Sequence, residues 1–218
     1  MTDSEAALIR AERELWRRYQ MAPVATRAYI FIRLRNFPKR LVWPALMDLY
    51  GAVVSVGAGY GLFETMAALA NPAVTFIASD ARAKRIALAR QATQGIPNIQ
   101  FEVFDLERGL PEVHAATFLL FDVLHHLPPE VQRTLLGGLV ERLPRGGRIL
   151  IKECGTRPVW KLCFNYLTDL VGAPGEATYP RSERHWASLL AAGGLETRVT
   201  RLDRGSPWAH ILIDGRKP

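Results

Sequence analysis

One stretch of the chain constrains the fold more than any other. Residues 53–61 read Val-Val-Ser-Val-Gly-Ala-Gly-Tyr-Gly, and the apolar segment 62–70 follows directly. The β-branched run predicts a strand, the glycines predict a sharp turn, and the apolar segment predicts a helix. This arrangement presents backbone N–H groups and a helix N-terminus to an anionic group on a nucleotide-like ligand. Glycine suits the turn because a ligand can approach closer than a Cβ would allow.

Two further features narrow the kind of ligand. The spacing is G-x-G-x-G, and Leu62 stands where a dinucleotide fingerprint needs its third small residue, which argues against an NAD or FAD site. Asp80 ends the next predicted strand, residues 74–79, at a distance from the glycines where an acid can accept hydrogen bonds from both ribose hydroxyls. Asp105 ends a third predicted strand, residues 99–104. Three successive strands therefore bring a glycine turn and two acids to one sheet edge.

A fourth motif follows at residues 120–128, which read Leu-Phe-Asp-Val-Leu-His-His-Leu-Pro. The four motifs resemble, in order and spacing, those of class I S-adenosylmethionine (SAM)-dependent methyltransferases, and the resemblance covers the chain from about residue 50 to about residue 215. Ser55 departs from the pattern, because the family usually has an acid there that helps to organise the glycine turn and the methionine ammonium. A serine can still accept a hydrogen bond.

The resemblance implies SAM as cofactor, with S-adenosylhomocysteine as product. The residues that match the family's cofactor-binding positions are Ser55, Gly57, Ala58, Gly59, Gly61, Asp80, Ala81, Asp105, Leu106, Phe121 and Asp122. His125 and His126 follow the fourth strand, beside the expected position of the methyl group, and are the candidate catalytic bases. The same motif occurs in family members with different acceptors, where the histidines hold the loop instead.

Alternating strands and helices from residue 53 onward predict a doubly wound α/β sheet. The resemblance implies seven strands, mostly parallel, with a C-terminal antiparallel hairpin. We expect a helical extension over residues 1–50 and a SAM-binding domain over 51–218, with an insert at about 153–180. The remaining strands are expected at 116–121, 148–152, 196–202 and 209–213, and helices at 4–21, 81–94, 130–143, 159–170 and 182–192.

The charge of the chain is concentrated near the N-terminus. Nine Lys and Arg residues lie between Arg10 and Arg40 against Glu12 and Glu14, so the net charge of this segment equals the +7 of the whole chain. Such a patch suggests an anionic partner (nucleic acid, a lipid surface or an acidic substrate) or a solvated helix face. Because residues 10–43 also carry aromatic and aliphatic side chains, they fit either a lid over the cofactor pocket or a peripheral contact with an anionic membrane.

The composition indicates in which cellular compartment the protein is expected. Cys154 and Cys163 form no disulfide framework and have no metal-ligand spacing, which fits a reduced cytoplasmic location and no structural zinc. The acidic first residues lack the features of a signal peptide, and no apolar run approaches the ~18–20 residues that span a bilayer. We therefore expect a cytoplasmic protein that is at most peripheral to the inner face of the membrane.

The sequence says less about the molecule that accepts the methyl group. Asp122-Val123-Leu124-His125 replaces the Asn/Asp-Pro-Pro-Tyr motif of enzymes that methylate exocyclic nitrogens, which argues against that class. Aromatic side chains in the N-terminal segment and the insert favour a small-molecule or lipid-like acceptor, methylated on O or N. The candidate acceptor contacts are Tyr19, Tyr29, Glu153, Trp160 and Tyr179. The alternatives are an RNA methyltransferase that uses the basic patch, for which Asp122 with Lys152 gives faint support, and a non-catalytic partner protein.

Overall fold

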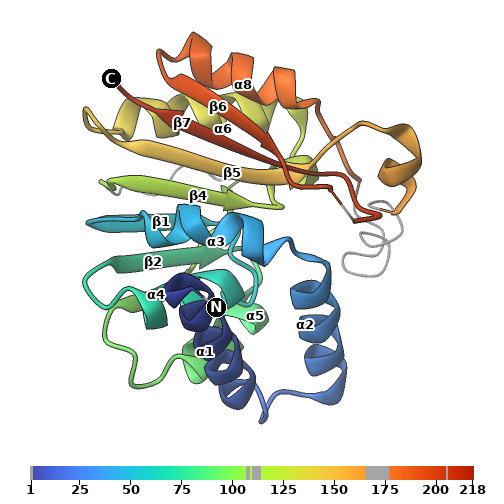
Figure 1. Cartoon of the computed structure of the whole chain (residues 1–218). Coiled ribbons are helices and arrows are strands. Elements are labelled where there is room, and N and C mark those ends of the chain that lie inside the picture. The colour runs from blue at the N-terminus through green and yellow to red at the C-terminus, as the bar shows by residue number, and fades with distance from the viewer. Residues whose placement is uncertain (1, 107–108, 110–113, 165–176, 205) are drawn as a thin grey trace. The chain divides into compact units, whose positions relative to one another are not determined.

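The computed structural model describes residues 2–106, 109, 114–164, 177–204 and 206–218 (Figure 1). The chain divides into two compact units, Met1–Asp105 and Leu106–Pro218. The predicted division into an extension over residues 1–50 and a domain over 51–218 stays a prediction.

The N-terminal unit contains three parallel strands in the order β3-β2-β1. Its Val-rich first strand is buried along most of its length, and the helix that follows the glycine turn is buried on nearly every side. Such all-round burial suits the apolar sequence 62–70. In chain order the elements are α1 (Asp3–Arg18), α2 (Val24–Asn36), α3 (Lys39–Met47), β1 (Ala52–Val56), α4 (Leu62–Ala70), β2 (Thr75–Asp80), α5 (Ala83–Ala92) and β3 (Ile99–Val103).

Helix α1 is defined by local signals at both ends. Thr2 caps it by accepting a hydrogen bond from the backbone N–H of Glu5 at 3.2 Å. Arginines occupy its last turn, where their positive charge interacts favourably with the helix dipole. Leu8, Leu15 and Tyr19, which are spaced to share one face, are all buried. The helix packs on α3 and α4. It ends at Arg18, three residues earlier than expected, with Tyr19 as its C-cap.

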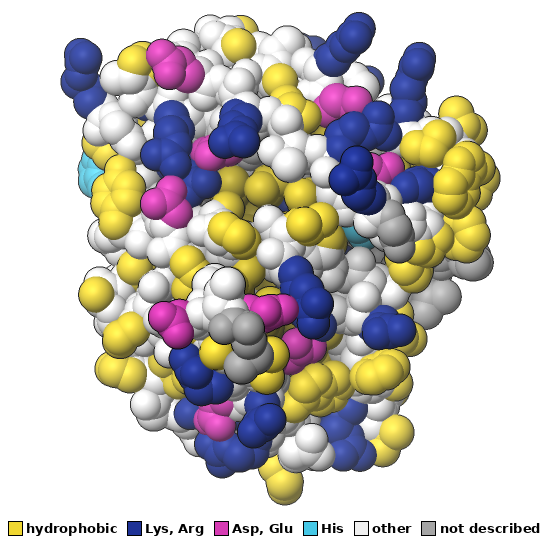
Figure 2. All heavy atoms as spheres, in the orientation of Figure 1, with side chains coloured by type: hydrophobic (Ala, Val, Ile, Leu, Met, Phe, Trp, Pro, Cys, Tyr) yellow, Lys and Arg dark blue, Asp and Glu magenta, His cyan; other side chains and the backbone are white. Residues whose placement is uncertain are grey.

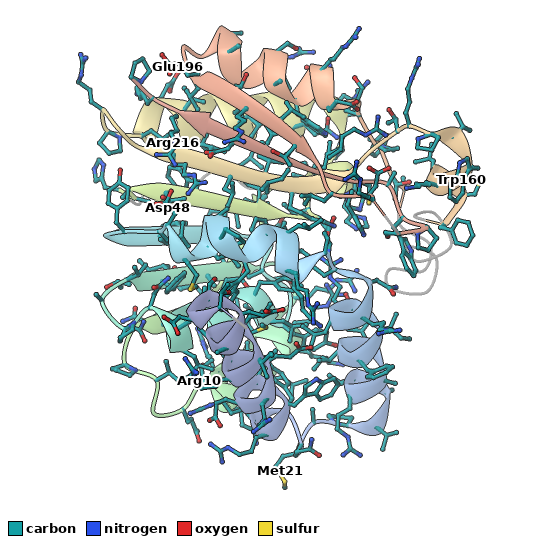
Figure 3. The ribbon with its side chains drawn as sticks, viewed as in Figure 1. Arg10, Met21, Asp48, Trp160, Glu196 and Arg216 are labelled. Carbon is teal, nitrogen blue, oxygen red and sulfur yellow. The ribbon has the colours of Figure 1, made fainter. Side chains whose placement is uncertain are left out.

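The outer surface of these helices mixes apolar and basic side chains. Met21 and Phe31 are 85% and 59% exposed, and Val24, Ile32 and Leu41 are exposed as well. Lys and Arg side chains lie among the hydrophobic ones over this unit in the space-filling view (Figure 2). Arg10 and Met21 both point outward from α1 and the turn after it (Figure 3).

The C-terminal unit contains four strands in the order β4-β5-β7-β6. Strand β4 pairs in parallel with β5, whereas β5 with β7 and β6 with β7 are antiparallel. Every residue of β4 and β5 is buried, as expected for the centre of an α/β sheet. The elements are β4 (Thr117–Phe121), the 3₁₀ turn η2 (Leu124–His126), α6 (Pro129–Arg142), β5 (Arg148–Cys154), α8 (Glu183–Ala192), β6 (Glu196–Arg201) and β7 (His210–Arg216).

The predicted fold class is confirmed. Among the described residues the seven expected strands all occur, with parallel pairs in both units and the antiparallel C-terminal hairpin. Of the helix expected over 159–170, residues 159–164 are helical and the remainder lies outside the described residues. No helix in the described parts of the chain is both long enough and apolar enough to cross a membrane.

Candidate functional site

The glycine turn between β1 and α4 has a backbone that other residues adopt only under strain. Gly57, Gly59 and Gly61 all have φ between 61° and 73°, in the left-handed region that favours glycine. A Cβ on Gly61 would clash with the ring of Phe101. The sequence therefore fixes both the shape of this turn and the space beside it.

Asp80, at the end of β2, holds the turn in place. Its Oδ2 accepts a hydrogen bond from the N–H of Gly59 at 2.9 Å, and its Oδ1 accepts one from the N–H of Arg82 at 2.9 Å. The N–H of Ala58 donates to the carbonyl of Ser79 at 2.8 Å, one residue earlier on the same strand. Each carboxylate oxygen accepts two hydrogen bonds, so Asp80 retains the capacity to bind two hydroxyl groups of a ligand.

The second predicted acid, Asp105, lies two residues beyond the end of β3, which pairs in parallel with β2. The N–H of Phe104 donates to the carbonyl of Asp80 at 3.1 Å, so the chain leaves β3 beside the end of β2. The N-terminal unit thus brings together the glycine turn, Asp80 and Asp105, as expected from parallel strands that end at one edge.

Ser55, which replaces the family's acid, has a partner that sequence reasoning missed. Its Oγ lies 2.6 Å from Oε1 of Glu64, and both side chains are 1% exposed. Glu64 comes from the first turn of α4. Burial raises the pKa of the Glu64 carboxyl, and the Ser55 hydrogen bond opposes that rise. The signal in the sequence was a lone acid in an otherwise apolar helix directly after the glycines.

The N-terminal helices reach the glycine turn through its middle residue, Tyr60. The hydroxyl of Tyr19 donates a hydrogen bond to the Tyr60 carbonyl, and burial raises the pKa of Tyr19. The rings of Tyr29 and Tyr60 lie 5.5 Å apart, and the Arg85 guanidinium lies 5.5 Å from the Tyr60 ring. Two of the candidate acceptor contacts, Tyr19 and Tyr29, are therefore next to the turn that the cofactor is expected to occupy.

In the C-terminal unit, the turn after β4 carries a buried network of charged groups. Asp122 has φ of 53°, and its carboxylate oxygens lie 2.6 and 2.7 Å from Nζ of Lys152, which is fully buried in β5. The N–H of Asp122 also donates to the Lys152 carbonyl at 2.8 Å. This ion pair connects the ends of two adjacent parallel strands.

Glu153 follows Lys152 on β5 and binds the same turn. Its Oε1 accepts hydrogen bonds from the N–H groups of Val123 and Leu124, at 3.0 and 2.7 Å. Its Oε2 lies 2.5 Å from Nδ1 of His125, and both side chains are buried. A carboxylate at Nδ1 holds the proton on that nitrogen and orients the ring. The structure thus brings candidate Glu153 to candidate His125.

The other candidates of this unit lie around the same turn or on the insert. The rings of His125 and His126 are 4.2 Å apart, and the N–H of Tyr179 donates to the His125 carbonyl at 2.6 Å. Trp160 is 56% exposed on the helical segment 159–164 and points away from the strands (Figure 3). The Trp160 and Phe164 rings lie 6.1 Å apart.

One group of described residues could offer ligand atoms to a metal ion. Atoms of Asp122, His125 and Cys154 lie within 4.8 Å of one another. The ammonium of Lys152 lies on both oxygens of Asp122, and its positive charge opposes a second cation there. These residues suit an ion pair and a histidine–carboxylate pair better than a metal.

Solved structures share this fold. An O-methyltransferase family protein from Burkholderia thailandensis matches with a TM-score of 0.70 at 17% identity, over 92% of this chain and 61% of its own. The S-adenosylmethionine-dependent methyltransferase SibL matches with a TM-score of 0.71 at 20% identity, over 88% and 57%. The chain has the class I methyltransferase fold. Magnesium protoporphyrin IX methyltransferase (ChlM) from Synechocystis PCC 6803, with bound SAH, matches with a TM-score of 0.62 at 20% identity, over 94% and 93%.

The chain spans 61% and 57% of the lengths of the first two of these methyltransferases. No protein-family model matches the sequence, and the search of curated proteins finds no match. The predicted roles of single residues in this site remain predictions.

Proposed function

We propose that this chain is a SAM-dependent methyltransferase that acts on a small, partly apolar acceptor. The observation that carries the proposal is the glycine turn itself. Three glycines with positive φ are held by Asp80, whose oxygens can each accept one more hydrogen bond. Such a turn fits a ligand with a ribose and an amino-acid part, and the solved structure of ChlM, of similar fold, contains SAH.

The residues proposed to hold the cofactor have separable roles. The glycine turn, with Gly57, Gly59 and Gly61, lies against the amino-acid part, Asp80 binds the ribose, and Asp105 with Leu106 contacts the adenine. Ala58, Ala81, Phe121 and Asp122 complete the proposed set. When bound, SAM supplies an electrophilic methyl group on a sulfonium sulfur. The chain's contribution is to exclude water and to hold the acceptor in line with that group.

For an acceptor hydroxyl, we propose His125 as the general base. Because Glu153 holds the proton on Nδ1, Nε2 is the basic nitrogen and can take the hydroxyl proton as the methyl group is transferred. This pairing of His125 with Glu153 favours O-methylation of a phenol or similar hydroxyl. The O-methyltransferase family protein with a similar fold is consistent with this preference.

We further propose an amphiphilic acceptor that is reached at an anionic membrane surface. The support is the exposed apolar and basic surface of α1, α2 and the turn between them, within residues 10–43. Tyr29 lies on α2 and contacts Tyr60 of the glycine turn, so a ligand bound along this helix would approach the cofactor.

Titration calorimetry with SAM and S-adenosylhomocysteine tests the core of the proposal. We expect both to bind the wild type, and Asp80→Ala to abolish measurable binding because the turn and the ribose lose their shared anchor. Glu196→Ala, at an exposed acid on β6, is the matched control and should bind normally. Failure of both ligands to bind folded wild type would refute the enzyme and leave the fold as a scaffold for a protein partner.

Two assays test the finer parts. Methyl transfer to a panel of phenols and anionic lipids should fall by about 10²–10⁴-fold in His125→Ala and much less in His126→Ala. Equal losses in the two variants would remove the general-base role.

Sedimentation with anionic and with neutral vesicles tests the membrane contact. The protein should associate with the anionic vesicles alone, and the Met21→Ser, Phe31→Ser double variant should lose this association. No association with either kind would remove the membrane proposal.

A further inference from the structure

The buried carboxyl of Glu64 is the least explained charged group in the N-terminal unit. Its Oε1 is bonded to Ser55, but its Oε2 has no hydrogen-bond partner among the described residues, although it is fully buried. A buried carboxylate oxygen without a donor is costly, so such a group is normally either protonated or bonded to something. Nothing in the packing of α4 requires an acid at this position, since its buried neighbours along the helix are apolar or Thr65.

The surroundings of Glu64 point to a ligand. Ser55 lies in β1 and Glu64 in the first turn of α4, so their contact joins the two elements that flank the glycine turn. Ser55 occupies the position where the resemblance predicts an acid. The hydroxyl of Ser55 therefore places the carboxyl of Glu64 close to where that missing acid would be.

The ionisable groups around Glu64 give it a mixed electrostatic environment. Asp80 on β2 opposes its ionisation, and Arg33 on α2 favours it. Tyr19, at the C-cap of α1, also interacts with it, and burial keeps that tyrosine neutral. The buried residues of α3 and β3, which also pack on α4, are apolar. Desolvation is the largest influence, and it raises the pKa of the Glu64 carboxyl.

We propose that Glu64, positioned by Ser55, is the carboxylate that receives the positively charged ammonium of the cofactor's amino-acid part, and that it ionises as the ligand binds. The proposal rests on the proposed function. In the empty protein, burial raises the pKa of the carboxyl, so it keeps its proton to a higher pH than an exposed glutamate does. As the ammonium arrives, the Glu64 O–H bond breaks, the proton passes to solvent, and the carboxylate accepts hydrogen bonds from the ammonium.

Comparison of two ligands isolates this interaction. S-adenosylhomocysteine carries the ammonium, whereas 5′-methylthioadenosine keeps the adenosine and sulfur but lacks the amino-acid part. Glu64→Gln should weaken S-adenosylhomocysteine binding by about 10- to 100-fold, as expected for a lost hydrogen bond to a charged group. The variant should bind methylthioadenosine as the wild type does. Equal weakening of both ligands, or of neither, would overturn the proposal.

A rescue variant separates the charge from the shape of the turn. Ser55→Asp combined with Glu64→Gln returns one carboxylate to the strand and should recover most of the lost affinity for S-adenosylhomocysteine. Thermal unfolding of each variant monitors folding, and Glu64→Gln should be at least as stable as the wild type because it removes a buried acid. No recovery in a folded double variant would contradict the assignment.

Proton release provides a readout that is independent of affinity. At a pH below the raised pKa of Glu64, the enthalpy of S-adenosylhomocysteine binding should depend on the ionisation enthalpy of the buffer in the wild type, and this dependence should disappear in Glu64→Gln. As the pH rises through the raised pKa of Glu64, proton release should fall and affinity should reach a plateau. A buffer-independent enthalpy in the wild type would overturn the ionisation step. If S-adenosylhomocysteine does not bind the wild type, the proposed function itself fails, a result distinct from the others.

Discussion

The turns after β1 and β4 are held in place in similar ways but differ in the residues that form them. In each, a carboxylate from the end of a neighbouring parallel strand accepts hydrogen bonds from backbone N–H groups of the turn. Asp80 on β2 does this for Gly59, and Glu153 on β5 does it for Val123 and Leu124. The first turn reaches positive φ at three glycines, whereas the second reaches it at Asp122, which is bonded to buried Lys152.

The difference indicates what each turn is built for. Glycines keep side chains out of the first turn, so a ligand can lie against its backbone. The second turn instead gathers side chains: an ion pair, a glutamate and a histidine, all buried or nearly so. We therefore interpret the first as a surface for binding and the second as a frame that orients His125.

Removal of the two carboxylates should have unequal effects on stability. Glu153→Ala leaves two backbone N–H groups and Nδ1 of His125 without their buried acceptor, and should lower the free energy of unfolding by about 3 kcal/mol or more. Asp80→Ala should cost only about 1–2 kcal/mol, because water can reach its less deeply buried site. Urea denaturation measures both, with Glu153→Gln as the control that keeps an acceptor oxygen. Equal losses would mean that the two turns are held alike.

Alanine substitutions in the glycine turn should separate backbone strain from lack of space. Gly59→Ala has room for its Cβ, so it should cost about 1–2 kcal/mol for the left-handed φ alone. Gly61→Ala should cost more, because the new Cβ meets the buried ring of Phe101. Denaturation curves of the two variants give the difference. If Gly61→Ala were the milder change, the tight packing of this turn against β3 would be refuted.

The two turns should also differ in their response to pH. The pKa of Glu64 is raised by burial above its ordinary value of 4.5, so the folded protein binds more protons than the unfolded chain above that pH. Stability should therefore fall as the pH rises from 4.5 to the raised pKa, by at most about 1.4 kcal/mol per pH unit. Glu64→Gln should lose this dependence and gain in stability relative to the wild type. A parallel pH profile in both proteins would show that Glu64 is not the group responsible.

Much of the first turn could be predicted from the sequence, because its information is local. The three glycines, the β-branched run before them and the acids at the ends of the next two strands each have a conformational or chemical reason that can be stated residue by residue. The alternation of strands and helices then fixed the fold class. The end of the first helix, predicted at residue 21 and found at Arg18, was less accurate, because capping and tertiary packing decide it.

The pairings of side chains could not be predicted in this way. Ser55 with Glu64 and His125 with Glu153 join residues 9 and 28 positions apart, and each pairing depends on which face of a strand or helix turns inward. Glu153 accepts hydrogen bonds from the turn after β4, which the sequence did not indicate, and its predicted contact with the acceptor stays a prediction. Positive φ at Asp122 has no sequence signal as clear as a glycine.

The smallest expected effect concerns the contact between α1 and the glycine turn. Tyr19→Phe removes the hydroxyl that donates to the Tyr60 carbonyl and should lower the free energy of unfolding by about 1 kcal/mol, because a buried acceptor loses its donor. Tyr29→Phe keeps the ring contact with Tyr60 and should cost less. If α1 positions the turn for the cofactor, Tyr19→Phe should also weaken S-adenosylhomocysteine binding, whereas Glu153→Gln should leave it unchanged. Calorimetry distinguishes these outcomes, and unchanged affinity in Tyr19→Phe would limit α1 to a structural role.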